Sequence, residues 1–142
     1  MLISTKGRYA LRVMIDLAEH PSEQFTPLKE IAERQNISEK YLESIIKLLV
    51  RGGMLHGLRG KGGGYKLSMS PEQCTVGHVL RLTEEGLAPV SCLSQETMQC
   101  PRAGECRTLP MWRELHRRIN EYLDSVTLAD LAMPDSGNEF II

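Results

Sequence analysis

The sequence predicts a mainly α-helical fold with one small β-hairpin, and three observations support this fold class. Apolar residues recur at intervals of three and four in several segments that Pro, Gly or polar breaks separate. One stretch, residues 54–69, instead contains two short strand-like runs joined by a glycine-rich loop. The length of 142 residues, with 42% apolar and 25% charged residues, fits one globular domain with an appendage.

The first half of the chain has the pattern of three helices. The first is expected over residues 6–19, and the second, with Pro27 near its first turn, runs to residue 35. A tight turn follows. Ser38 is then the N-cap candidate of a third helix, which ends at residue 51 before two glycines. The second and third helices therefore form a helix-turn-helix unit.

The glycine-rich stretch after the third helix is expected to form a wing. Strands over residues 54–58 and 65–69 flank the loop 59–64, whose glycines permit positive φ, while Arg59 and Lys61 place positive charge at the tip. A flexible hairpin without function is one alternative. A nucleotide phosphate loop is another, but neither its Lys-Ser or Lys-Thr ending nor a following helix is present. A hairpin directly after a helix-turn-helix predicts a winged helix-turn-helix that binds DNA.

The predicted DNA contacts lie on the exposed face of the third helix and on the wing. On the helix, charged and aromatic residues point away from the apolar stripe, as expected where a recognition helix meets bases and phosphates. The wing loop is expected to lie along a minor groove. The predicted DNA-binding residues are Lys40, Tyr41, Glu43, Lys47, Arg59, Gly60 and Lys61.

The second half of the chain contains two further helical regions separated by a long loop. Thr75 is the N-cap candidate of a fourth helix, which Gly86 closes. A long amphipathic helix begins at residue 111, and its stripe predicts a dimer seam, although packing onto its own domain gives the same periodicity. The predicted division is a winged helix-turn-helix domain over residues 1–86, a cysteine-containing cluster-binding loop over 87–110, dimerisation helices over 111–133 and a flexible tail over 134–142.

Charge is distributed unequally along the chain. Residues 1–66 carry 11 Lys and Arg against 7 Asp and Glu, a net +4, whereas residues 67–142 carry 6 against 11, a net −5. A modest positive charge on the DNA-binding half suits contact with phosphates. The sequence has neither a secretory signal nor an apolar run long enough to cross a bilayer, so we expect a cytoplasmic protein with no membrane partner and with reduced cysteines.

Three of the four cysteines fall in the long loop. Cys92, Cys100 and Cys106 are separated by seven and five residues, and thiolates are the ligands of iron-sulfur clusters. A cluster is the favoured interpretation. A structural zinc site and three unligated thiols stay as alternatives, although the closely spaced cysteine pairs typical of zinc sites are absent. Cys74 lies outside the loop and is interpreted as a small, partly buried residue.

Several segments resemble the Rrf2 superfamily of bacterial winged-helix transcriptional regulators, of the IscR, NsrR, RirA and CymR type. These segments are STKGRYAL, LKEIAERQNIS, KYLESIIKLL, LRGKGGGYKLS and TVGHVLRLTE, so the resemblance extends over nearly the whole chain. It implies a homodimer that binds a pseudo-palindromic operator in double-stranded DNA, with a long C-terminal helix that crosses the dimer. In the IscR branch, the residues matching Tyr41, Glu43 and Arg59 recognise the operator. Lys40 stands where that branch has Ser, which changes the expected operator preference.

The resemblance also implies an iron-sulfur cluster, [2Fe-2S] or [4Fe-4S], held by the three loop cysteines. The histidine ligand of the IscR branch falls on Leu109, and the aspartate ligand of the NsrR branch falls on Arg8, so neither ligand is available here. The candidates for the fourth position are Glu105, His116, a residue of the partner subunit, solvent or a small thiol. The cysteine spacing is closer to that of RirA-like iron regulators than to that of the IscR branch.

These observations predict a DNA-binding transcriptional regulator that senses iron, iron-sulfur or redox and nitrosative status through its cluster. The alternative is a regulator of the same fold without a cluster, resembling CymR, which a metabolite or a protein partner controls. An enzyme is not expected. A cysteine nucleophile could be assembled from Cys74, His78 and Asp124, but no nucleophile elbow, HExxH motif or carboxylate pair supports such a site or a metal hydrolase.

Overall fold

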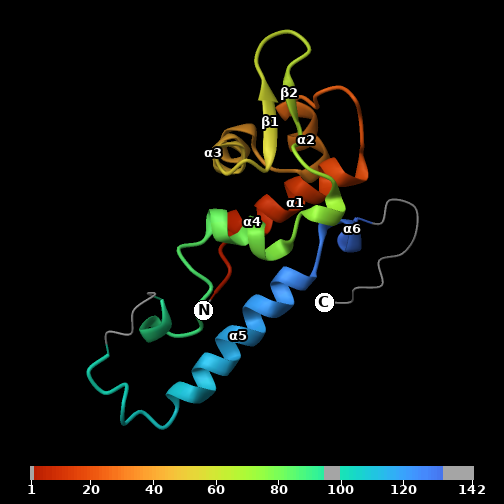
Figure 1. Cartoon of the computed structure of the whole chain (residues 1–142). Helices are drawn as coiled ribbons and strands as arrows, with labels where there is room; N and C mark the ends of the chain where they lie inside the picture. Colours follow the sequence, from red (N-terminus) through yellow and green to blue (C-terminus); the bar gives the residue numbers. More distant parts are fainter. Residues whose placement is uncertain (1, 95–99, 133–142) are drawn as a thin grey trace.

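A computed structural model describes residues 2–94 and 100–132 of the chain (Figure 1). Three helices come first, a two-stranded antiparallel hairpin follows, and three helices complete the described part, so the predicted fold class is confirmed. The elements are α1 (Thr5–Glu19), α2 (Leu28–Gln35), α3 (Glu39–Arg51), β1 (Leu55–Leu58), β2 (Gly64–Leu67), α4 (Val76–Thr83), α5 (Leu109–Ser125) and α6 (Leu128–Leu131). Short 3-10 turns lie on each side of α4, at η1 (Pro71–Gln73) and η2 (Ser91–Leu93).

Local hydrogen bonds begin the helices where the sequence predicts them. The Ser38 side chain accepts from the backbone N–H of Tyr41 at 3.2 Å, and the Thr75 side chain accepts from that of His78 at 3.1 Å, so both predicted N-caps are confirmed. Between α2 and α3, Asn36 adopts a left-handed conformation with φ of 54°. This single residue turns the chain sharply, because the left-handed conformation ends α2 and two residues later α3 is capped.

The main hydrophobic core is built around α1, which packs against α2, α3, α4 and α6. Its fully buried side chains come from every region of the domain, including the hairpin and the end of the described chain. They include Val13, Met14, Ile31, Leu42, Ile45, Ile46, Leu49, Met54, Leu55, Cys74, Val79 and Leu128. A second, smaller cluster joins α4 to the chain around α5 and α6, and it contains Val76, Leu80, Leu87 and Val126.

The hairpin is fastened to the helical body at its base. β1 pairs with β2 in the register Leu55 with Leu67 and Leu58 with Gly64, so β2 begins one residue earlier than predicted. Gly64 has φ of 147°, and a Cβ there would lie 2.1 Å from the carbonyl oxygen of Thr26. The neighbouring Tyr65 exchanges two backbone hydrogen bonds with Thr26, at 2.9 and 2.8 Å. Glycine at position 64 therefore permits the close approach that fixes the wing to the segment before α2.

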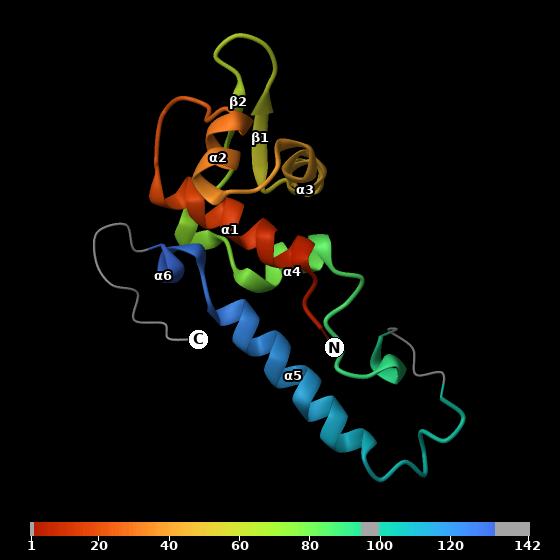
Figure 2. The same ribbon diagram turned by 180° about the vertical axis from the view of Figure 1, so that it is seen from behind.

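Helix α5 extends away from the body at the end opposite the hairpin, as both views show (Figures 1 and 2). It begins two residues earlier than predicted, at Leu109, because Pro110 is accommodated in the first helical turn. The chain then returns to the body. The N–H of Val76 donates to the carbonyl of Val126 at 2.9 Å, and the N–H of Leu128 donates to that of Cys74, also at 2.9 Å.

Residues 126–131 consequently pack within the winged-helix body, although the sequence pattern grouped them with the dimerisation helices. The predicted domain boundaries stay a prediction, and the tail predicted over residues 134–142 lies outside the described residues. No helix in the described part of the chain is long and apolar enough to span a membrane.

Candidate functional site

The two faces of α3 differ sharply in burial. Its buried stripe consists of Leu42, Ile45, Ile46 and Leu49. The opposite face exposes the helix residues predicted to contact DNA, which are Lys40, Tyr41, Glu43 and Lys47. Lys47 Nζ lies 3.8 Å from Glu43 Oε1, but both side chains are more than half exposed. Such a solvated pair is weak, so each side chain remains available for contact with DNA.

The tip of the hairpin exposes the other predicted contacts, Arg59, Gly60 and Lys61. Gly60 and Gly62 have φ of 91° and 76°, a region that favours glycine, and the N–H of Gly63 donates to the carbonyl of Gly60 at 2.9 Å. The loop is therefore a defined turn. Its glycines lack side chains, so Arg59 and Lys61 alone extend side chains from this loop.

A groove of about 630 Å³ runs between α3 and β1. Among the predicted contacts, Glu43, Lys47 and Arg59 line it. The structure thus brings side chains of the recognition helix and of the wing, two successive elements of the chain, to one concave surface. The aliphatic side chains of Leu58 and Val50 are 49% and 37% exposed at this groove.

Six residues that line this groove were not among the predicted contacts: Ile46, Val50, Arg51, Gly57, Leu58 and Tyr65. Arg51 follows Lys47 by four residues, so helical spacing places the two on one face and could have identified Arg51 as a contact. Alternation along the strand places Leu58 and Leu55 on opposite faces of the hairpin, but it does not show which of the two faces is buried. Apolar side chains in such a position suit contact with thymine methyl groups.

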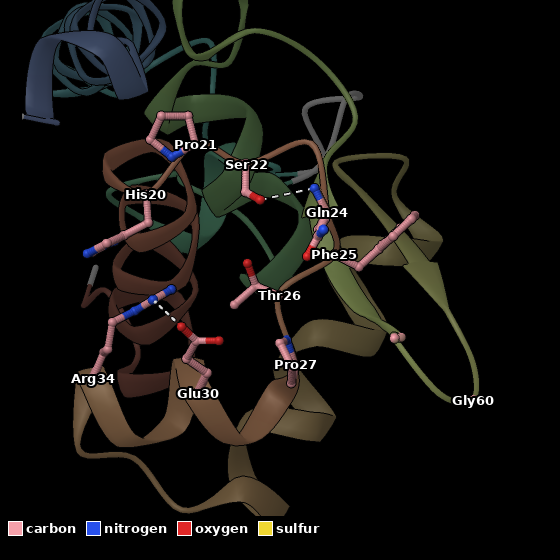
Figure 3. A pocket seen from close by; sticks show the side chains of 12 residues that line it. His20, Pro21, Ser22, Gln24, Phe25, Thr26, Pro27, Glu30, Arg34 and Gly60 are labelled. Atoms are coloured by element: carbon pink, nitrogen blue, oxygen red, sulfur yellow. Dashed lines mark hydrogen bonds and ion pairs between the residues drawn. The ribbon is translucent and has the colours of Figure 1, made fainter.

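A second cavity of about 750 Å³ lies on the other side of the wing, between its loop and the segment that joins α1 to α2 (Figure 3). Gly60 lines this cavity, together with His20, Gln24 and Arg34. Of the remaining predicted contacts, Lys40, Tyr41 and Lys61 line neither cavity.

The three loop cysteines occupy different environments. Cys92 lies in η2 and is partly buried, Cys100 is exposed, and Cys106 is partly buried shortly before α5. Five of the seven residues between Cys92 and Cys100 lie outside the described residues. Within residues 2–94 and 100–132, no three His, Cys, Asp or Glu side chains lie close enough together to bind one metal ion. The predicted thiol ligands are therefore present but not gathered.

The thiols also differ in their acidity. Cys106 Sγ lies 3.4 Å from the hydroxyl oxygen of Thr108, and hydrogen bonding to Thr108 lowers the pKa of this thiol, with a smaller contribution from Arg102. Cys74, in contrast, is fully buried, and desolvation raises its pKa to about 11. Burial thus disfavours the thiolate form of Cys74, whereas the contacts of Cys106 favour its thiolate form, the form in which a cysteine binds metal.

The two residues proposed for the fourth ligand position lie apart. Glu105 is exposed in the loop. His116 is partly buried on α5, where it lines a cavity of about 600 Å³ together with Leu93, the neighbour of Cys92. Its Nδ1 lies 3.3 Å from the side-chain nitrogen of Asn120. His116 therefore shares a cavity with the neighbour of Cys92, whereas Glu105 directly precedes Cys106 in the chain.

A helix-turn-helix followed by a fastened β-hairpin, with an exposed recognition face, defines the class of winged-helix DNA-binding proteins. The family model named Rrf2, described as an iron-dependent transcriptional regulator, matches residues 3–134. The chain belongs to this family.

Individual relatives agree with this assignment. The HTH-type transcriptional regulator IscR of Aliivibrio salmonicida is 38% identical over 131 residues, which cover 92% of this chain and 77% of that protein. Protein rrf2 of Nitratidesulfovibrio vulgaris is 41% identical over 131 residues, with coverage of 92% and 87%.

Solved structures of the same family are also similar. CymR, the global cysteine regulator of B. subtilis, has a TM-score of 0.76 and 37% identity, covering 96% of this chain and 99% of that one. IscR of T. potens has a TM-score of 0.72 and 35% identity, covering 99% and 97%. The relatives are transcriptional regulators, so the chain is assigned to that class of protein.

Proposed function

We propose that two copies of this chain bind an operator in double-stranded DNA in the cytoplasm, and that an iron-sulfur cluster on the loop cysteines changes their affinity for it. The observation that carries the DNA-binding part is the groove between α3 and the wing, where Glu43, Lys47 and Arg59 converge. In this arrangement α3 enters the major groove, and the wing tip with Arg59 and Lys61 reaches the neighbouring minor groove.

The surface of α5 supports the homodimer. Met111, Leu115 and Tyr122 are 52%, 40% and 61% exposed on a helix that extends away from its own body. A helix that exposes several large apolar side chains requires a partner surface, and a second copy of the same helix supplies a self-complementary one. The dimer then sets the spacing of the two recognition helices.

The chemistry of the donor set supports the cluster. Cys92, Cys100 and Cys106 are three soft ligands in one loop, and the pKa of Cys106 is lowered toward the thiolate form. When bound, a cluster would supply a redox-sensitive and oxygen-sensitive group. Because the described residues do not gather these thiols, the loop must change its conformation for all three to bind one cluster.

The contacts between α5 and α4 supply a route from the loop to the DNA-binding face. Arg81 of α4 donates to both carboxylate oxygens of Asp124, at 2.6 and 3.0 Å, and to Asn120 Oδ1 at 2.7 Å. At the other side of α4, a Cβ at Gly52 would lie 2.5 Å from the Leu82 side chain, so α4 touches the end of the recognition helix directly. A change in the loop that moves α5 therefore moves α4 against α3.

Anaerobic purification followed by iron and sulfide quantitation and visible absorbance tests the proposal. We expect bound iron and an operator affinity that differs between the loaded and the iron-free protein. Serine variants of Cys92, Cys100 and Cys106 should each lose the visible absorbance. Cys74→Ala is the matched control and should retain it, and alanine is preferred to serine there because a buried hydroxyl would be poorly solvated.

One alternative has a specific observation in its favour. The described residues hold no group of metal ligands, and CymR of B. subtilis, the global cysteine regulator of that organism, has a similar structure. A cluster-free regulator that a metabolite or a protein partner controls is therefore the second candidate. Protein that is purified anaerobically with its three loop cysteines intact, contains no iron and still binds its operator normally would replace the sensor proposal with this one.

A further inference from the structure

A buried carboxylate lies where α1 passes the end of α2. The Asp16 side chain is 0% exposed and accepts hydrogen bonds from Arg34 Nε at 3.0 Å, from Arg34 Nη2 at 2.7 Å and from Gln35 Nε2 at 2.8 Å. Arg34 pairs in addition with Glu30 at 3.0 Å, as Figure 3 shows. Both donors belong to the last turn of α2. The buried charge therefore holds this end of α2 against α1, since a carboxylate without these donors would be strongly destabilised.

Arg12, one helical turn before Asp16, holds the same end of α2 from the other side. Its Nε donates to Gln35 Oε1 at 3.2 Å, and a second guanidinium nitrogen donates to the backbone carbonyl of Gln35. The Gln35 amide is thus held at both ends, its nitrogen by Asp16 and its oxygen by Arg12. Gln35 directly precedes Asn36, the left-handed residue at which the chain turns into the recognition helix.

The same guanidinium reaches the recognition helix through two aromatic rings. The Arg12 Cζ lies 4.9 Å from the ring centroid of Tyr9, in cation-π geometry. The Tyr9 ring packs edge-on against Tyr41, with 5.8 Å between centroids and 82° between planes. Tyr41 lies in the first turn of α3 and is 36% exposed. A continuous series of contacts therefore leads from a buried carboxylate to a residue of the predicted DNA interface.

We propose that Arg12 and Gln35 are positioning residues for operator recognition, which join Asp16 to the Tyr9 and Tyr41 rings and so set the orientation of the first turn of α3. The inference rests on the proposed function, because it takes Tyr41 as a DNA contact. Arg12 contacts the first turn of α3 indirectly at two places. It holds the main chain at Gln35, just before Asn36, and it stacks on the Tyr9 ring that packs against Tyr41. Contact residues must be held to within about half an ångström for specific recognition, and rigid neighbours provide this precision.

The closing experiment measures operator affinity, non-specific DNA affinity and the salt dependence of both for Arg12→Lys, Tyr41→Ala and the double variant. Lysine keeps the positive charge of Arg12 but lacks the planar fork that contacts Gln35 twice while stacking on Tyr9. We expect Arg12→Lys to lose about tenfold in operator affinity, the scale of one or two lost hydrogen bonds and a cation-π contact. Non-specific affinity and the salt dependence should not change, because no phosphate contact is lost.

The double variant separates positioning from direct contact. If Arg12 acts through Tyr41, then Arg12→Lys added to Tyr41→Ala should weaken binding much less than it does in the native background. Additive losses with a smaller salt dependence would instead identify Arg12 as a direct phosphate contact and overturn the proposal. Arg8→Lys is the matched control, since Arg8 lies exposed on the same helix and bonds only its neighbour Thr5 among the described residues.

Gln35→Met removes the side-chain hydrogen bonds of Gln35 to Asp16 and Arg12 without changing the net charge. It should reduce operator affinity in the same direction, and the urea unfolding midpoint of each variant shows whether it is folded at the assay temperature. In one outcome, folded Arg12→Lys and Gln35→Met variants both keep normal operator affinity while Tyr41→Ala clearly loses it. That result would refute the positioning role and leave the proposed DNA interface standing. Normal affinity in Tyr41→Ala would instead refute the interface of the proposed function.

Discussion

Leu128→Ala tests whether the chain after α5 belongs to the DNA-binding body. The Leu128 side chain is 0% exposed and packs in the main core, and its N–H donates to Cys74. Alanine removes three carbon atoms, worth about 2.4 kcal/mol at roughly 0.8 kcal/mol for each buried methylene. The cavity that remains adds to this loss, so we expect a decrease of about 3 kcal/mol in the free energy of unfolding, within the range of about 2–5 kcal/mol for such changes.

Urea unfolding and thermal melting at one fixed protein concentration measure this loss, since dimerisation makes the apparent stability depend on concentration. A decrease of about 3 kcal/mol corresponds to a fall of about 10 °C in Tm for a domain of this size. Leu131→Ala is the matched control, because Leu131 lies in the same helix but is only partly buried at the smaller cluster, and its loss should be clearly smaller. A loss below about 1 kcal/mol for Leu128→Ala would mean that α6 does not contribute to the core.

Three further predictions concern the wing, the dimer and the surface of α5. Arg59→Ala should weaken operator binding by about 1–3 kcal/mol and leave the dimer intact, and unchanged affinity at matched salt would exclude the wing from recognition. Replacing Leu115 and Ile119 together with Glu should produce monomers in light scattering, because charges buried in a dimer seam are poorly solvated; a persisting dimer would contradict this seam. Hydrogen bonds from Arg117 and Arg118 lower the pKa of Glu114 from 4.5 to about 2. Its contribution to stability is therefore fully present above pH 4.5 and is lost as the pH falls toward 2, and an NMR titration midpoint near 4.5 would contradict these contacts.

Local signals in the sequence were sufficient for the helices and the hairpin. Ser38 and Thr75 cap helices through backbone groups only three residues away, so the interaction is already specified by adjacent sequence. The glycines of the wing act in the same way, since the positive φ of Gly60 and Gly62 is a property of the individual residue. The resemblance of whole segments to Rrf2 regulators then identified the family, which the match over residues 3–134 confirmed.

The candidate site was predicted less completely. Helical spacing placed Glu43 and Lys47 on the exposed face of α3, but only the folded chain shows that they share a groove with Arg59 and Leu58 of the wing. The cysteine spacing identified three candidate ligands without indicating how far apart they lie. Spacing along a loop without periodicity specifies no distances, because such a segment has no regular backbone geometry.

The sequence by itself therefore determined the local structure and the family of this protein. The tertiary structure decided which of its surfaces pack against one another. An apolar stripe shows that a helix face is buried but not what covers it, so Leu128 could be assigned to the core only from the fold. The contacts of Asp16 with Arg34 and Gln35 likewise join residues 18 and 19 positions apart on two different helices. Such pairings depend on how helices cross, and crossing geometry arises from packing between elements rather than from the pattern within any one of them.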